Sequence, residues 1–145
     1  LEALAWDHDR LDALERAAFE FRAAGDLATA TTLFEKFARG LVRHIGFEED
    51  LLFPILEKKI GFPPTAGPTA VMRAEHVEIR AALEGIRAAM PDPLADPLPF
   101  RRQLHDALGP HNEKEEQILY PMADRCLMPE GADDLVSRIQ RYPAP

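Results

Sequence analysis

The sequence predicts an all-α protein, and two observations carry this prediction. Apolar residues recur at alternating steps of three and four along four separate stretches, which is the spacing of one face of an α-helix. No stretch shows the alternation of apolar and polar residues that is typical of a half-buried strand. We therefore expect an antiparallel, up-and-down four-helix bundle with a short C-terminal helix.

The four apolar stretches mark the expected helices of the bundle. In chain order they run from Leu4 to Phe21, from Ala30 to Ile55, from Met72 to Met90 and from Leu104 to Met122. Four of the five histidines fall on these stretches, at helical spacing from their apolar neighbours. These histidines are His8, His44, His76 and His111. We therefore expect their imidazoles to face the interior of the bundle.

Glycine and proline separate the expected helices. Gly25 ends the first helix, and Asp26 caps the second. Residues 60–68 hold two glycines and three prolines, and residues 91–99 hold four prolines, so we expect both segments to be loops. Three further prolines lie inside the helical patterns, and we expect kinks there because the apolar spacing resumes beyond each one. They are Pro54, Pro110 and Pro121.

The last part of the chain leaves the apolar pattern. From about Pro129 onward the apolar residues no longer continue the helical spacing of the fourth stretch, and a short helix is expected near Ala132–Gln140. We expect residues 1–128 to form the bundle as one domain and residues 129–145 to form a tail. Because the sequence begins with Leu1 rather than methionine, we expect the natural chain to begin earlier.

Composition excludes several classes of partner and site. The formal net charge of −8 argues against a nucleic-acid partner. The single cysteine, Cys126, excludes an internal disulfide and a cysteine-based metal site. No apolar run approaches the roughly 20 residues of a membrane span, so we expect no membrane partner. A reducing compartment fits this cysteine usage, and we expect a cytoplasmic location.

One motif occurs twice in the chain. His44-x-x-x-Glu48-Glu49-x-x-Leu52-Phe53-Pro54 is matched by His111-x-x-x-Glu115-Glu116-x-x-Leu119-Tyr120-Pro121. A shorter echo precedes each copy, as Asp7-His8-x-x-Leu11 and as Glu75-His76-x-x-Ile79. The chain therefore consists of two related helical hairpins, each with a lone histidine and a histidine–glutamate pair. Histidine and glutamate four residues apart lie on one helix face, where both can reach one buried metal.

The loops predict that the four histidines form one layer. In an antiparallel bundle, residues that are equally distant from a turn lie at one level. His8 and His44 are equally distant from the turn at Asp26, and His44 and His76 are equally distant from Ile60 at the start of a loop. His76 and His111 are likewise equally distant from the proline-rich loop. Three separate loops thus agree on the same layer.

Such a layer is costly to bury without compensating charge. Two carboxylates and four imidazoles in an apolar interior need strong partners, or their pKa values must shift. A pair of divalent or trivalent cations would supply the compensation, and oxygen and nitrogen donors without thiolate favour iron or manganese over a structural zinc. The candidate metal ligands are His8, His44, Glu48, His76, His111 and Glu115.

At these residues the chain resembles the hemerythrin-like, or HHE cation-binding, family. The resemblance covers about Asp7 to Arg125, and its most specific part is the motif that begins at His111. It implies an antiparallel four-helix bundle around a non-haem di-iron centre. It also implies that the four histidines of the apolar stretches bind the metals terminally and that Glu48 and Glu115 bridge the metals. The metals themselves would be two iron ions that share an oxo or hydroxo bridge. Manganese and zinc are the alternative metals.

One position departs from the oxygen-carrying hemerythrins. Those proteins have a second histidine four residues after the ligand of the third helix, and Arg80 stands at that position here. Six protein ligands remain, which is closer to the bacterial six-ligand di-iron branch that includes iron–sulfur-repair and nitric-oxide-responsive proteins. A missing ligand leaves a coordination position open to water, oxygen, nitric oxide or peroxide.

The resemblance implies a protein that binds or reacts with oxygen, nitric oxide or peroxide, for sensing, storage or stress response. A redox enzyme that decomposes peroxide or reduces nitric oxide, with an electron donor as a further partner, is one alternative. An iron-sensing binding module is a second, and a purely structural bundle without metal is a third. The sequence leaves open whether the protein is an enzyme and whether it forms an oligomer.

Several neighbours of the ligands have expected roles of their own. We expect Glu49 and Glu116 to be solvated or to support the ligands, because each lies one step round the helix from a ligand. We expect Tyr120 to be a core aromatic that matches Phe53, with the alternative that its phenol donates a hydrogen bond to a bound oxygen species. His105 lies off the ligand face, so we expect it to be exposed.

Overall fold

The structure is a computed structural model and describes residues 1–127 and 129–145. It is helical, and the described residues contain no strand, which confirms the all-α prediction. The helices are α1 (Glu2–Ala23), α2 (Leu27–Phe47), α3 (Phe53–Ile60), α4 (Pro68–Ala89), α5 (Leu98–Lys114), α6 (Tyr120–Cys126) and α7 (Pro129–Gln140). Two π-helical turns, η1 (Glu48–Leu52) and η2 (Glu115–Leu119), join α2 to α3 and α5 to α6.

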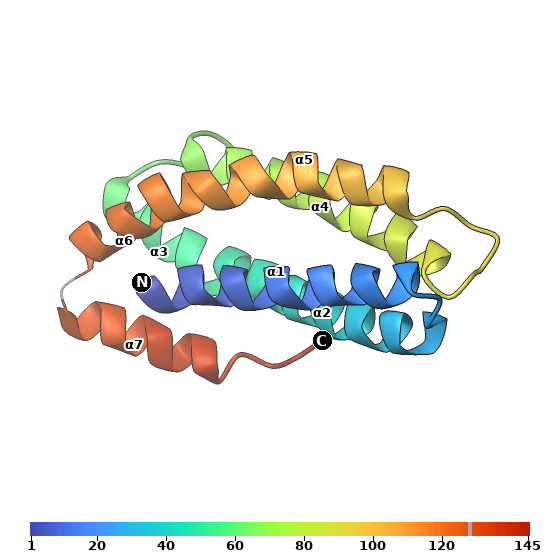
Figure 1. Cartoon of the computed structure of the whole chain (residues 1–145). Coiled ribbons are helices and arrows are strands. Elements are labelled where there is room, and N and C mark those ends of the chain that lie inside the picture. The colour runs from blue at the N-terminus through green and yellow to red at the C-terminus, as the bar shows by residue number, and fades with distance from the viewer. Residues whose placement is uncertain (128) are drawn as a thin grey trace.

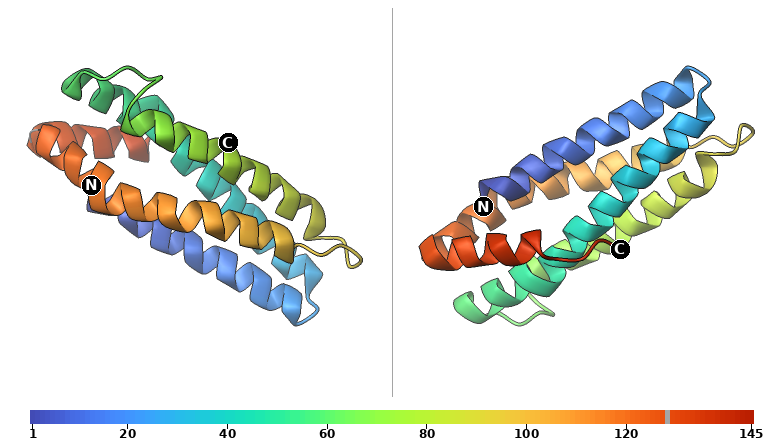
Figure 2. Two further views of the ribbon diagram at one scale, coloured as in Figure 1. Left: turned by 90° about the horizontal axis from the view of Figure 1, so that it is seen from above. Right: turned by 90° about the horizontal axis from the view of Figure 1, so that it is seen from below.

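Four long helices lie side by side and form the body of the molecule (Figures 1 and 2). α1 packs mainly on α2, α4 packs mainly on α5, and α2 also contacts α4. Through the π-helical turns, α3 extends α2 and α6 extends α5 toward the end of the molecule where the N-terminus lies (Figure 1). The two hairpins of the repeated motif therefore pack against each other along their length.

The turns between the helices follow the expected chemistry. The Asp26 carboxylate accepts a hydrogen bond of 3.0 Å from the backbone N–H of Thr29, so Asp26 caps α2 as predicted. Gly25, just before it, has a φ of 88°, which a side chain would disfavour. Gly61 ends α3 in the left-handed conformation, and Pro68 occupies the first turn of α4.

The helices continue past all three internal prolines. Pro110 lies inside α5, whereas Pro54 and Pro121 each follow a π-helical turn. In these turns the N–H of Phe53 donates to the carbonyl of Glu48, and the N–H of Tyr120 donates to the carbonyl of Glu115. A π turn inserts one extra residue into the helix and often marks a functional site. We expected kinks at these prolines, but the sequence analysis did not identify the π turns that precede two of them.

The apolar core is divided into two clusters, and the candidate ligands lie between them. One cluster contains Leu11 with most of the buried side chains near the Gly25 turn, and the other contains Leu4 with those near α3, α6 and α7. On α1, His8 thus lies between Leu4 of one cluster and Leu11 of the other. The same order holds on α4 around His76. The polar layer is therefore flanked by apolar residues on both sides along the helices.

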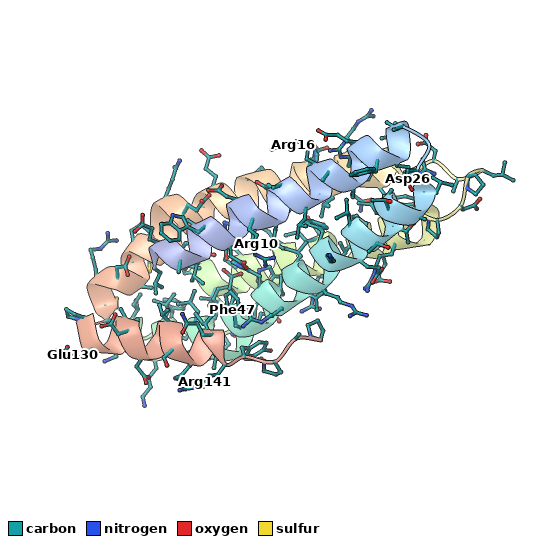
Figure 3. The ribbon with its side chains drawn as sticks, turned by 60° about the horizontal axis from the view of Figure 1, so that its bottom comes forward. Arg10, Arg16, Asp26, Phe47, Glu130 and Arg141 are labelled. Atoms are coloured by element: carbon teal, nitrogen blue, oxygen red, sulfur yellow. The ribbon has the colours of Figure 1, made fainter. Side chains whose placement is uncertain are left out.

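α7 packs against the end of the long helices. It begins three residues before the expected start near Ala132 and ends at the expected residue, Gln140. Leu135 and Ile139 are buried in the cluster that also contains Phe47, which lies near α7 (Figure 3). The predicted boundary after residue 128 falls on a residue outside those described. Within the described chain, no helix combines the length and the apolar character that crossing a membrane requires.

Candidate metal centre

The structure brings all six predicted ligand side chains together in one buried layer. None is more than 4% exposed. Their donor atoms form two groups, and within each group the atoms lie within 4.8 Å of one another. One group contains His8 and His44, the other contains His76 and His111, and both contain Glu48 and Glu115. The two groups of possible metal donors therefore share both carboxylates.

The histidines of each group face each other through their Nε2 atoms. The two Nε2 atoms are 3.0 Å apart for His8 and His44, and 3.1 Å apart for His76 and His111. Two nitrogen ligands about 2.1 Å from one cation and at right angles to each other lie about 3.0 Å apart. The observed separations therefore fit two imidazoles on one metal ion.

In three of the four histidines, Nδ1, the ring nitrogen that faces away from the donor groups, contacts a carboxylate. The Nδ1 atoms of His44, His76 and His111 lie 2.8, 2.9 and 2.9 Å from carboxylate oxygens. Their respective partners are Asp7, Glu49 and Glu75. An ionised carboxylate only accepts hydrogen bonds, so each Nδ1 donates and each Nε2 is left to offer a lone pair to the interior. This orientation is typical of histidines that bind metals.

Facing lone pairs need a proton or a cation between them. Two unprotonated Nε2 atoms at 3.0 Å repel, so each histidine pair requires a proton or a metal cation in the gap. Three buried polar atoms also lack a hydrogen-bond partner among the described residues: Nδ1 of His8, Oε1 of Glu48 and Oε2 of Glu115. Free carboxylate oxygens beside paired imidazoles suit a metal centre rather than a structural hydrogen-bond network.

The comparison with protein families agrees with this geometry. The family model described as the hemerythrin HHE cation-binding domain matches residues 2–123, which include all six candidate ligands. The chain belongs to the hemerythrin HHE cation-binding family. No curated protein and no solved structure matches the chain. Family membership indicates cation binding, and the buried histidine–glutamate groups are residues able to hold the cation.

The two shared glutamates of this hemerythrin domain strongly influence each other. Burial and the neighbouring charge of Glu48 raise the pKa of Glu115 to about 8. Burial alone would also raise the pKa of Glu48, but the charge of His44 and hydrogen bonds around it hold that pKa well below its usual value. Without metal, these opposite shifts favour a proton on Glu115 over one on Glu48. A cation that takes Glu115 as a ligand would displace such a proton.

The two histidines of the first group also differ in their protonation. Burial would lower the pKa of His44, but the Glu48 charge and the hydrogen bond to Asp7 raise it to about 10. Burial and the charge on His44 lower the pKa of His8 to about 4. Without metal, these opposite shifts favour a shared proton on His44 over one on His8. A cation would replace this proton in the gap between the Nε2 atoms.

Tyr120 belongs to the apolar core together with Phe53, as expected, and its phenol also reaches into the site. Its phenol donates a hydrogen bond of 2.6 Å to Oε2 of Glu48 and lies 3.1 Å from Nε2 of His44 and 3.2 Å from Nε2 of His8. Burial and the two nearby carboxylates raise its pKa well above the usual value. Its counterpart Phe53 stacks on His76 with a centroid distance of 5.7 Å. The difference between Phe53 and Tyr120 in the repeat was the signal in the sequence.

The remaining neighbours lie outside the donor groups. The side chain of His105 is 51% exposed, as expected, and its Nε2 lies 3.0 Å from the buried carboxylate of Glu15. Arg80 is half-buried and lines a surface cavity with Tyr142. Glu49 supports His76 and is not in either donor group, which agrees with the role expected for it.

Proposed function

We propose that this chain is a non-haem di-iron protein of the hemerythrin type, built as an antiparallel, up-and-down four-helix bundle. The observation that carries the proposal is the pair of donor groups that share both glutamates. A carboxylate common to two sites is suited to bridge two cations, and bridging keeps the cations close despite their mutual repulsion. Manganese or zinc could occupy the same donors, and iron is favoured because histidine and carboxylate suit it.

Each ligand has a distinct role in this proposal. His8 and His44 hold one metal terminally, His76 and His111 hold the other, and Glu48 and Glu115 bridge the two. The carboxylates behind three of the histidines fix the imidazole rings and raise their basicity. The two apolar clusters limit the access of bulk water to the layer from either end of the bundle.

The bound iron pair would supply redox chemistry and an open coordination position for oxygen, nitric oxide or peroxide. The six candidate protein ligands support a relation to the bacterial six-ligand branch, because Arg80 stands where the further histidine would be. We propose a cytoplasmic protein without nucleic-acid or membrane partners, in which binding of the small ligand serves sensing, storage or stress response.

A redox enzyme is the second candidate, and Tyr120 favours it. The phenol lies beside the His8–His44 half, where it can donate a hydrogen bond or a proton to a reacting oxygen atom. Such an enzyme would decompose peroxide or reduce nitric oxide with electrons from a separate donor. Continued consumption over many turnovers distinguishes this candidate from a protein that reacts once and then holds its ligand.

The first test is the metal content and visible spectrum of protein from iron-replete cells. We expect about two irons per chain and an absorption that changes with dithionite and returns with air or nitric oxide. A protein without metal, or with one spectroscopically silent zinc, would contradict the di-iron proposal. Loss of helical structure on chelation would favour an iron-sensing module, because stability derived from the ligands disappears with the metal.

A further inference from the structure

A cavity between α1 and α5 reaches one of the candidate ligands. Its volume is about 510 Å³, and its wall includes His8 together with residues of both helices. Three other cavities, lined by described residues near Arg102, Val136 and Arg80, contain none of the six candidate ligands in their walls. The α1–α5 cavity therefore connects the surface with the His8 side of the centre.

The wall of this cavity is acidic. Five carboxylates and two guanidinium groups line it, which leaves a formal charge of −3. The carboxylates belong to Asp9, Asp12, Glu15, Glu113 and Glu116. Arg101 is neutralised within the wall, because its Nε donates to Glu15 at 2.7 Å. The remaining excess of negative charge attracts cations and disfavours anions.

His8 presents an unused polar atom at this wall. It is 4% exposed, and its Nδ1 is buried without a hydrogen-bond partner among the described residues. The nearest carboxylate oxygen, on Glu116, lies 3.9 Å away. In the other copy of the motif the corresponding Glu49 bonds to Nδ1 of His76 at 2.9 Å. His8, which lines the cavity, therefore lacks the carboxylate contact that its counterpart His76 makes.

We propose that the α1–α5 cavity is the route by which a divalent cation reaches the centre. This inference rests on the proposed metal centre and adds the path and the order of loading to it. The carboxylates of Asp12 and Glu116 draw the cation inward, and the His8–His44 half is filled before the His76–His111 half. Nδ1 of His8 is available to meet the cation because no carboxylate accepts a hydrogen bond from it among the described residues.

Gly109 offers a way to block the cavity. It lines the wall, lies within α5, and a Cβ built on it meets no atom within 4 Å. Gly109→Trp would therefore place an indole in the cavity, whereas Gly109→Ala would leave the cavity open. The alanine variant also carries whatever strain a Cβ introduces before Pro110, so the difference between the two variants reports the bulk of the side chain.

The experiment follows Co²⁺ uptake by the metal-free protein through its visible absorption after rapid mixing. We expect uptake by Gly109→Trp to be slower than uptake by Gly109→Ala by about tenfold or more, because the indole fills the path, with the same two ions bound at the end. Uptake by Gly109→Trp at the rate of Gly109→Ala would overturn the proposal.

A charge variant provides an independent measurement. Asp12→Asn should slow uptake by a few-fold, roughly, and weaken its dependence on salt, since steering by charge is screened by ions. Asp106→Asn is the matched control, because Asp106 lines a different cavity on α5. Equal rates for the two variants would contradict the acidic route. A wild-type protein that binds no Co²⁺ at equilibrium would instead contradict the metal centre itself.

Discussion

The two halves of the candidate metal centre come from one repeated motif, yet they differ in what surrounds the histidines. In the half formed by His76 and His111, carboxylates hold both Nδ1 atoms, and Phe53 stacks on one ring. In the half formed by His8 and His44, one Nδ1 has no hydrogen-bond partner among the described residues, and the Tyr120 phenol reaches both Nε2 atoms. The acidic cavity opens onto the His8–His44 half.

The comparison separates the features that the two halves share from those that differ. The candidate ligands are the residues that the repeat preserves, namely the histidines and the first glutamate of each copy. One polar contact that differs arises where the copies diverge, at Phe53 and Tyr120. The other, at Nδ1 of His8, differs although Glu116 matches Glu49. We infer that the His76–His111 half is a rigid anchor and that exogenous ligands react at the His8–His44 half.

Removal of a shared glutamate should break both halves and has the largest expected effect. We expect Glu115→Ala to lose at least one of the two metals, because the remaining cations would repel without the bridging charge. Metal content per chain, measured by atomic spectrometry, tests this expectation. His105→Ala is the control, since its side chain is 51% exposed and belongs to neither donor group. Retention of two metals by Glu115→Ala would mean that this residue is no bridge.

Removal of the supporting carboxylates should sharpen the difference between the halves. Glu49→Ala frees Nδ1 of His76, and such losses typically weaken metal binding by about 10–100-fold. Glu116→Ala should weaken it less, because its carboxylate lies 3.9 Å from Nδ1 of His8 and makes no hydrogen bond there. Competition with a chelator measures both affinities. Equal losses would show that Glu116 closes on His8 when metal is bound.

Tyr120→Phe should make the two halves alike. The variant should keep two metals, because all six candidate ligands remain in place. It should be less stable without metal by about 1–2 kcal/mol, since Oε2 of Glu48 loses a buried hydrogen bond of 2.6 Å. Its reaction with oxygen, nitric oxide or peroxide should also change in rate, whereas Phe53→Leu should leave this rate near that of the wild type. An unchanged rate in Tyr120→Phe would remove the phenol from the chemistry.

Most of the fold and the candidate ligand groups could be predicted from the sequence because they follow from periodicity. The alternating steps of three and four set the helices, and the distances of the histidines from the turns set their common layer. The Asp26 cap was predictable for the same reason, since capping depends on nearby residues. These features depend on spacing along the chain alone.

The features that were missed depend on contacts between helices. The π turns begin at Glu48 and Glu115, and nothing in the local pattern distinguishes them from ordinary helix before a proline. The position of the Tyr120 hydroxyl depends on how α6 packs on the first hairpin, so the core role seemed the better expectation. The pairing of Asp7 with His44 and of Glu75 with His111 likewise joins residues from neighbouring helices.

Removal of an ion pair outside the centre should have the smallest effect on stability and none on metal content, so it serves as a reference for the variants at the centre. The Glu57 carboxylate accepts hydrogen bonds from Arg73 and from Thr69, and it is 7% exposed. Burial would raise the pKa of Glu57, but these two partners hold it below its usual 4.5. A lowered pKa in the folded state means that this stability is present above about pH 4.5 and is lost as the pH falls through the lower, folded value.

Glu57→Gln should therefore cost about 1 kcal/mol at neutral pH, where charge-assisted hydrogen bonds are lost, and less as the pH falls. Urea unfolding of the metal-free protein at pH 7 and at pH 4 measures both values. Glu57 joins α3 to α4, the helix that carries His76. If carboxylates such as Glu49 hold the His76–His111 half by themselves, the variant should leave the metal content unchanged. A loss of metal would mean that the rigidity of that half depends on the α3–α4 contact instead.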